Sequence, residues 1–557
     1  MMKSGIIGAG NSGIVYTTSE VSLGVEEISF DDKRPDAIST FTTFFELQGY
    51  QVMVLGNNKL IITKNRTIMQ NKSGSIIHAS DFYKVSHPPQ YPIGTTEVYS
   101  NITARGSRIA EIDKIVVFGL QYFVQAYLIH RFNTEFFQAD KAEVLRKYQR
   151  RMDTALGPNA VTTARWGQLH DLGYLPLVIK ALPEGSRVTM RVPFLTIKNT
   201  HPDFFWLTNW VESLMSNVIW HPITVATIAH SYRQLLDEYA HATSDMPEFV
   251  QWQGHDFSYR GLDESAPICG AGHLLSFTGT DTIPAIDLLE DYYGAHAETE
   301  LIGGSIPATE HSVMCMGGEH GELETFRRLI TEVYPSGPVS IVSDTWDYWH
   351  TLTETLVILK DRILARDGKV VIRPDSGDPV KIVVGDPDAR WDSPEARGTI
   401  QVLWDIFGGT VNSKGYKQLD PHIGAIYGDS ITYDRAHEIL KGLRAKGFAS
   451  TNIVFGIGSY TYQMVTRDTF GMAMKATAGV VRGERVVISK NPKTDNGLKK
   501  SALGLLRVDA VDGAFVLTEH VSEAQEHAGS LEVIFTDSTT PLRQQSLQEI
   551  RERLVRS

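Results

Sequence analysis

The chain has 557 residues, of which 42% are hydrophobic and 21% are charged, a composition typical of a globular protein large enough for more than one domain. Its formal net charge of −12 argues against nucleic acid as the main partner. Because Cys269 and Cys315 are the only cysteines and form no CxxC pair, the sequence supports neither a disulfide framework nor a structural zinc site, and a reducing cytoplasm is the expected compartment.

The first stretch of interest is GIIGAGNSG, in which Gly8, Gly10 and Gly13 have GxGxxG spacing. A dinucleotide site needs a strand before such glycines, a helix after them and an acidic residue about 20 positions on. The residues that follow show no sustained helical period, so a dehydrogenase built on these glycines is the weakest hypothesis. We expect residues 1–68 to be an appended segment of unknown role, with Met69 as a possible alternative start and no signal peptide.

Residues 69–250 mix strand and helix patterns. The most apolar helix-like stretch, residues 114–130, is interrupted by Gln121 and Gln125 and is too short to span a bilayer, so no membrane association is expected. Residues 205–240 form a long helical pattern rich in aromatic residues. We interpret these aromatic side chains as core or subunit interface.

One pattern recurs through residues 251–475, where short apolar runs end in polar, Gly-rich loops and helical patterns often follow. Strands that alternate with helices predict a parallel sheet, and this many units favour a β/α barrel. In the helical pattern around residues 319–335, the expected buried face holds Leu323, Phe326, Ile330 and Val333. A later helix is expected to bury Ala436, Ile439, Leu440 and Leu443 and to end near Gly447.

The loops that follow the barrel strands are the expected active-site face. Val370–Ile372, for example, leads directly into Arg373 and Asp375. Taken alone, that loop could be an ordinary solvated turn, because Pro, Asp, Ser and Gly all favour turns. The last two loops, YGDS and GIGSY, are suited to backbone N–H donation to an anion, which predicts a phosphorylated substrate.

Strand patterns return after residue 476, and a closing helix has a capping box formed by Ser546 and Glu549. The predicted fold is therefore α/β. It combines an irregular β/α barrel over residues 251–475 with a second, discontinuous α+β domain, rich in antiparallel strands, over residues 69–250 and 476–557.

Many sequence motifs occur in a fixed order, among them SDFYKVSHPPQYP, FWLTNWVES, HDFSYRG, FTGTD, IPATEHS, VSDTWD, IRPDSG, NSKGYK, YGDS and TRD. By these motifs, residues 76–557 resemble the nicotinamide phosphoribosyltransferase family. The resemblance implies transfer of a phosphoribosyl group from phosphoribosyl pyrophosphate to nicotinamide, in NAD salvage. It also implies a homodimer with active sites at the subunit interface. ATP would be a co-substrate coupled through a phosphohistidine, and Mg²⁺ would arrive with pyrophosphate and ATP.

The resemblance assigns roles to individual positions. The catalytic positions are His311, Arg373 and Asp375, with His311 as the phosphate acceptor. The nicotinamide positions are Phe257, Arg260, Asp281 and, from the partner subunit, Tyr83. The phosphoribosyl and phosphate positions are Arg105, Ser340, Asp344, Gly428, Asp429, Gly458, Ser459, Arg467, Lys475 and Lys490, with Arg467 again from the partner subunit. The chain has Gly458-Ser459-Tyr460 where vertebrate members have a longer glycine run, which leaves the Ser459 contact open.

Each assignment has a structural alternative. Asp281 could be a turn or helix-capping residue, His311 a structural histidine and Lys490 a solvated surface lysine. A nicotinate-specific enzyme would be expected to have a cation or a neutral donor in place of Asp281. A non-catalytic binding protein would be expected to lack His311, Arg373 or Asp375. The sequence contains no dedicated all-protein metal site, so Mg²⁺ is expected to be held largely by phosphates and water.

Overall fold

The computed structural model describes residues 74–257, 261–489, 501–536 and 541–556 with their side chains, and the backbone of five strands within residues 3–64. Contacts divide the chain into two units, residues 1–78 and residues 79–557. The domain boundaries predicted at residues 68, 250 and 475 stay predictions.

The first unit is an antiparallel sheet in the order β1-β2-β3-β5-β4. Its strands are β1 (Lys3–Ile7), β2 (Ile14–Val21), β3 (Val25–Phe30), β4 (Tyr50–Gly56) and β5 (Lys59–Lys64). Gly8, Gly10 and Gly13 lie outside the described residues, but the strands on either side of them, β1 and β2, pair antiparallel. A strand therefore follows the glycines where a dinucleotide-binding unit would have a helix, which agrees with ranking that hypothesis as the weakest.

In the second unit, one six-stranded sheet has the order β20-β19-β6-β10-β8-β23. Its strands are β6 (Thr95–Thr103), β8 (Leu177–Ala181), β10 (Pro193–Asn199), β19 (Ala473–Val481), β20 (Glu484–Val487) and β23 (Glu532–Phe535). All five pairings are antiparallel. The sheet thus unites strands from two distant parts of the sequence. Smaller antiparallel pairs are β7 (Lys114–Val116) with β9 (Arg187–Thr189), β15 (Gly409–Val411) with β16 (Lys417–Leu419), and β21 (Leu505–Val511) with β22 (Ala514–Val521).

The other six-stranded sheet is parallel and has the order β12-β11-β18-β17-β14-β13. Its strands are β11 (Gly254–Asp256), β12 (Gly279–Thr280), β13 (Val339–Val342), β14 (Val370–Arg373), β17 (Ile423–Tyr427) and β18 (Ile453–Ile457). Val370, Val371 and Ile372 are all buried, as expected for strands covered on both faces. Parallel bridges also join Gly279 to Gly304 and Ala308 to Ser340, so residues 304–308 lie between the two edge strands.

Helices pack around both sheets. Those in and near the antiparallel part are α2 (Phe82–Val85), α3 (Leu120–Tyr122), α4 (Lys141–Leu156), α5 (Ala164–Leu172), α6 (Leu207–Trp210), α20 (Glu523–His527) and α21 (Leu547–Arg556). Those among the parallel strands are α8 (Val250–Gln253), α9 (Ala266–His273), α10 (Ile283–Tyr293), α11 (His311–Met316), α12 (Glu322–Arg328), α13 (Tyr348–His350), α14 (Leu356–Leu364), α15 (Pro379–Val384), α16 (Pro394–Arg397), α17 (Thr399–Phe407), α18 (Tyr433–Ala445) and α19 (Ser459–Tyr462).

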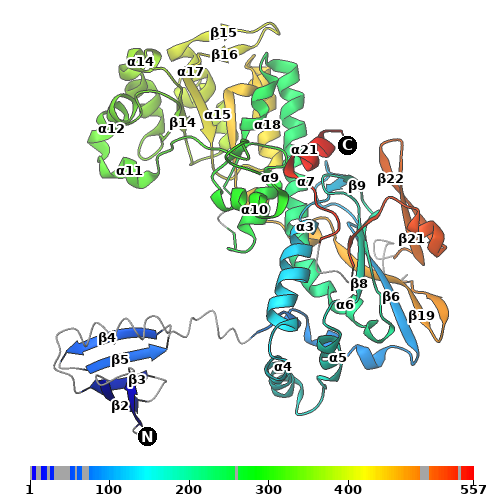
Figure 1. The fold of residues 1–557 in the computed structure, drawn as a ribbon. Coiled ribbons are helices and arrows are strands. Elements are labelled where there is room, and N and C mark those ends of the chain that lie inside the picture. The colour runs from blue at the N-terminus through cyan, green and yellow to red at the C-terminus, as the bar shows by residue number, and fades with distance from the viewer. Residues whose placement is uncertain are drawn as a thin grey trace. The chain divides into compact units, whose positions relative to one another are not determined.

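The long helix α7 (Glu212–Thr243) connects the two parts of this unit (Figure 1). It contacts α9 and α18 on the side of the parallel sheet and β7 and β19 on the other side. Trp206 and Trp210, just before it, are buried, as the core interpretation of the aromatic residues predicted.

The predicted helix faces are mostly correct. Ala436, Ile439, Leu440 and Leu443 are all buried in α18, and Gly447 has the positive φ of a helix-ending glycine. Phe326 and Ile330 are also buried, but Leu323 is only partly buried. The prediction for Val333 is wrong, because this residue is 43% exposed. Leu329–Val333 form a π-helical turn, which has more residues per turn than an α-helix, so Val333 falls out of phase with the buried Phe326 and Ile330.

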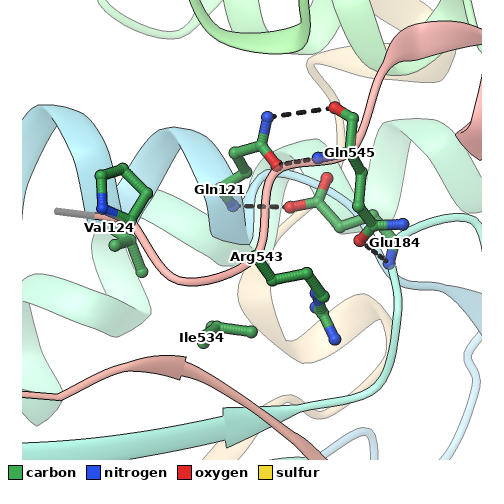
Figure 2. A pocket seen from close by; sticks show the side chains of 7 residues that line it. Gln121, Val124, Glu184, Ile534, Arg543 and Gln545 are labelled. Carbon is green, nitrogen blue, oxygen red and sulfur yellow. Dashed lines mark hydrogen bonds between the residues drawn. The ribbon is translucent and has the colours of Figure 1, made fainter.

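The C-terminal segment is anchored by hydrogen bonds to the antiparallel part (Figure 2). Gln545 exchanges hydrogen bonds with Gln121, and its side chain accepts one from the backbone N–H of Glu184. The Glu184 carboxylate accepts from the backbone N–H groups of Gly119 and Gln121 beside a small cavity. The expected capping box at Ser546 and Glu549 is present. Within the described residues, no helix is long and apolar enough to cross a membrane.

Candidate active site

The ends of the parallel strands bring most of the predicted site residues to one edge of the sheet. Phe257 follows β11, Asp281 follows β12 and Asp344 lies shortly after β13. Arg373 ends β14, and the glycine loops Gly428-Asp429 and Gly458-Ser459 follow β17 and β18. Because the carboxyl ends of parallel strands meet at the same edge, residues far apart in sequence become neighbours there.

Asp344 organises the loop after β14. Its Oδ2 accepts hydrogen bonds from the backbone N–H of Asp375 at 2.8 Å and from the hydroxyl of Ser376 at 2.6 Å. Its Oδ1 lies 3.5 Å from Nε2 of His311, whose side chain is 50% exposed. Three predicted site residues on three different segments are therefore brought together.

Arg373 and Asp375 form the charged part of this cluster. Nε of Arg373 lies 3.4 Å from Oδ2 of Asp375, and its Nη2 donates to the backbone carbonyl of Thr309 at 2.7 Å. Burial raises the pKa of Asp375; Arg373 opposes this effect, whereas the negative charge of Asp344 adds to it. With both carboxyls ionised, the two carboxylates outnumber the one guanidinium, so the cluster has excess negative charge, which suits it to hydroxyl donors and to a developing cation.

Phe257 packs against the glycine loops. A Cβ added at Gly458 would lie 2.4 Å from Cε2 of Phe257, and one added at Gly456 would lie 2.8 Å from its Cε1. A Cβ at Gly428 would lie 2.9 Å from Oδ1 of Asp375. The glycines therefore provide the space in which an aromatic ring and a carboxylate approach the same backbone loops.

Asp281 is held by two neighbours. Nε2 of His255 lies 3.0 Å from its Oδ1, and the hydroxyl of Ser305 donates to the same oxygen at 2.6 Å. Burial by itself raises the pKa of Asp281, but the contact with His255, the Ser305 hydrogen bond and the charge of Arg373 together outweigh it, so the net pKa is lowered. Asp281 is therefore an ionised acceptor in the same electrostatic field as Arg373.

Three of the predicted cationic residues lie near the junction of β6, η12 (Arg467–Thr469) and β19. Nε of Arg105 donates to the carbonyl of Gly471 at 2.9 Å, and Nζ of Lys475 donates to the carbonyl of Met474 at 2.9 Å. Arg467 pairs with Asp468 at 2.9 Å. No contact between described residues joins these cations to Asp375 or Asp344.

For the remaining predicted residues, the described part of the structure gives no contact with the charged cluster or with Asp281. Tyr83 is 59% exposed on α2, where its neighbours are His87 and Lys84. Ser340 is buried on β13, and its hydroxyl has no hydrogen-bond partner among the described side chains and backbone. Ser459 is exposed at the start of α19. Arg260 and Lys490 lie outside the described residues, so their assignments stay predictions.

Sequence reasoning missed His255 and Ser305. The signal available was weak: His255 stands within the motif GHDFSYRG, and Ser305 precedes IPATEHS. Their contact with Asp281 depends on the register that pairs His255 with Gly279 and on the bridge from Gly279 to Gly304. Across the part of the chain with described side chains, no group of three or more His, Cys, Asp or Glu residues could hold a metal ion.

Comparisons with known proteins identify the family of the chain. The family described as nicotinate phosphoribosyltransferase matches residues 252–525, and the nicotinamide phosphoribosyltransferase N-terminal domain matches residues 75–154. The chain is 55% identical over 492 residues to the nicotinamide phosphoribosyltransferase of Acinetobacter baylyi, covering 86% of this chain and 97% of that protein. It is 37% identical over 434 residues to that of Mycoplasma pneumoniae, covering 75% of this chain and 92% of that protein.

Among solved structures, the nicotinate-nucleotide pyrophosphorylase from Pyrococcus furiosus has a similar fold, with a TM-score of 0.52 and 13% identity over 86% of this chain and 95% of that chain. This likeness concerns the fold alone. The 55% identity to the Acinetobacter protein extends over nearly its whole length and shows the family as well as the fold. The chain belongs to the nicotinamide phosphoribosyltransferase family.

Proposed function

We propose that the chain is a nicotinamide phosphoribosyltransferase of NAD salvage, which forms nicotinamide mononucleotide and pyrophosphate from nicotinamide and phosphoribosyl pyrophosphate. The observation that carries this proposal is Asp281, an ionised acceptor at the same strand-end face as Phe257, Arg373 and Asp375. A carboxylate there accepts an N–H from the amide of nicotinamide, whereas it repels the carboxylate of nicotinate.

The reaction needs positioning and charge stabilisation more than proton transfer. The ring nitrogen of nicotinamide carries a lone pair and no proton, so it forms the new bond to C1′ of the ribose without a general base. The bond from C1′ to the pyrophosphate oxygen breaks, and pyrophosphate leaves with the electron pair. The protein therefore has to align the ring with C1′, stabilise a cation-like sugar and receive an anion.

Phe257 and Asp281 are proposed to hold the base. The flat ring of nicotinamide stacks on Phe257, and Tyr83 of the partner subunit covers the other ring face. The 59% exposure of Tyr83 in a single chain supports a role completed by a second copy. Arg260 is proposed to reach the base or the neighbouring phosphate.

The charged cluster is proposed to hold the sugar. Asp375 accepts hydrogen bonds from the 2′- and 3′-hydroxyls of the ribose, with Arg373 facing the phosphoribosyl group and Asp344 fixing the loop. Gly428, Asp429, Gly458 and Ser459 surround the 5′-phosphate, and Ser340 supports the same group. The cations proposed for pyrophosphate are Arg105, Lys475, Lys490 and, from the partner subunit, Arg467.

Mg²⁺ is proposed to enter as part of the pyrophosphate substrate, where it neutralises phosphate charge. The donor set fits this role: the carboxylates of Asp344 and Asp375 lie side by side, and Oδ1 of Asp344 accepts no hydrogen bond from the described residues, although Nε2 of His311 lies 3.5 Å from it. Carboxylates are suitable ligands for Mg²⁺, which is bound mainly by water and phosphate in such sites.

ATP is proposed as a co-substrate: an imidazole nitrogen of His311 forms a bond to the γ-phosphorus, the bond from that phosphorus to the bridging oxygen breaks, and ADP leaves with the electron pair. The half-exposed imidazole of His311 beside Asp344 supports this assignment, because the carboxylate can orient the ring while the ring stays accessible.

The architecture around the site is proposed to be an irregular β/α barrel. The bridges at Gly304 and Ala308 support closure of the parallel sheet between β12 and β13. We further propose a homodimer with composite active sites. Because Cys269 and Cys315 are both free thiols, a reducing cytoplasm remains the proposed compartment.

The direct test supplies wild-type protein with nicotinamide, phosphoribosyl pyrophosphate and Mg²⁺, and measures nicotinamide mononucleotide and pyrophosphate. Equimolar formation of both products is expected. Asp375→Asn should abolish most turnover, whereas Asp405→Asn, a change of the same type on the exposed surface of α17, should not. Absence of product from folded wild-type protein would overturn the proposal.

A further inference from the structure

Asp281 receives hydrogen bonds from two neighbouring segments of the parallel sheet. His255 lies on β11, Asp281 follows β12, and Ser305 follows Gly304, which bridges to β12. The backbone N–H of Asp281 also donates to the carbonyl of Asp256 at 2.9 Å. The position of this carboxylate is therefore set by two neighbouring segments, β11 and the one that holds Ser305, as well as by its own loop.

Both side-chain contacts end on the same oxygen. Nε2 of His255 and the hydroxyl of Ser305 both approach Oδ1, while Oδ2 accepts no hydrogen bond from any residue described. An ionised carboxylate only accepts hydrogen bonds, so Nε2 of His255 must carry the proton. The arrangement fixes one oxygen to the protein and leaves the other for a donor from outside.

The imidazole of His255 is itself closely packed. Its side chain is 14% exposed, and a Cβ added at Gly279 would lie 2.9 Å from its Nδ1. Gly279 thus leaves the space that the ring occupies, and the ring has little freedom to turn away from Asp281. Asp281, in contrast, is 50% exposed and would sample several rotamers without these contacts.

We propose that His255 and Ser305 are positioning residues for base selection: they fix Oδ1 of Asp281 so that Oδ2 faces the carboxamide N–H of nicotinamide. This inference rests on the proposed function and adds two residues to its specificity. Neither residue needs to touch the base. Loss of either donor should therefore weaken nicotinamide binding through Asp281, with little effect on the sugar or on phosphoribosyl pyrophosphate.

The experiment compares matched pairs of variants. His255→Leu removes the donor and His255→Gln keeps an N–H of similar reach; Ser305→Ala removes the hydroxyl and Ser305→Thr keeps it. The donor-free variants should raise KM for nicotinamide up to about tenfold, the effect expected if the carboxylate that is no longer fixed loses its hydrogen bond to the carboxamide. The kcat and the KM for phosphoribosyl pyrophosphate should stay close to wild type, and the donor-keeping variants should recover most of the loss.

A second measurement separates positioning from direct contact. In an Asp281→Ser background, His255→Leu and Ser305→Ala should have no further effect on the KM for nicotinamide, because their target is gone. An undiminished effect in that background would overturn the proposal, as would unchanged KM in both donor-free variants of an active enzyme. If His255→Leu does not fold, Ser305→Ala, at an exposed hydroxyl, still decides the question. Failure of wild-type protein to use nicotinamide would instead overturn the proposed function.

Discussion

Replacing Gly458 by alanine adds a single methyl group where the ring of Phe257 already lies. The new Cβ would be 2.4 Å from Cε2 and 2.8 Å from Cδ2 of that ring. Carbon atoms in favourable contact are about 3.5–4.0 Å apart, so the ring must move by about 1 Å or more. Gly458 has a φ of −125°, outside the left-handed region that favours glycine, and the clash with the ring is the main expected effect.

The expected magnitude follows from the contact that is lost. An aromatic pair contributes about 0.5–1.5 kcal/mol beyond its buried area, which corresponds to about a two- to twelve-fold rise in KM for nicotinamide. The assay is steady-state kinetics with nicotinamide varied at saturating phosphoribosyl pyrophosphate. Gly321→Ala is the matched control, because a Cβ there meets no atom within 4 Å and its φ is −97°.

A coupling measurement tests the reasoning itself. With Phe257→Ala already present, Gly458→Ala should change KM for nicotinamide much less than it does in wild type, because there is no ring to displace. An equal effect with and without the ring would refute the argument. So would a KM for Gly458→Ala that matches the Gly321→Ala control.

Three further predictions concern other parts of the chain. His311→Ala should lose most ATP-dependent stimulation and the acid-labile phosphoenzyme while keeping its KM for nicotinamide, and a phosphoenzyme at wild-type level would contradict this. Burial raises the pKa of Asp375, whose ionised form is the proposed sugar ligand, so kcat/KM for phosphoribosyl pyrophosphate should be full above that pKa and fall as the pH drops through it. This acidic limb should lie above the range of an ordinary aspartate, and a limb within that range would be evidence against Asp375. Deletion of residues 1–68 should leave kcat/KM unchanged, and loss of folded, active protein would assign that segment a structural role.

Much of the fold was predictable because the local sequence indicates which strands are buried on both faces. Val370, Val371 and Ile372 form an unbroken apolar run, which is typical of a strand covered on both faces, and all three are buried in the parallel sheet. The rule that loops at the carboxyl ends of such strands meet then placed Arg373, Asp375 and Gly428 together. Val333 was misplaced because a π-helical turn changes the helical phase, and the periodicity of the sequence does not reveal this turn.

The candidate site was predictable only in part. The proximity of Asp344 and Asp375 follows from strand order, but the two donors on one oxygen of Asp281 depend on strand register and on a single bridge at Gly304. No local pattern encodes those pairings. The proposed role of Tyr83 could not be predicted from local patterns for a different reason: it depends on a second copy of the chain.

Base selectivity tests the central claim most directly. The ratio of kcat/KM for nicotinamide to kcat/KM for nicotinate should be measured for wild type and for Asp281→Asn under identical conditions. Wild type should favour nicotinamide by about 100-fold or more, as expected when the wrong base leaves polar groups of the site unpaired and like charges face each other. Asp281→Asn should reduce this ratio at least about tenfold, because the repulsion against nicotinate is removed. A wild-type enzyme that prefers nicotinate, or a ratio that Asp281→Asn leaves unchanged, would contradict the account.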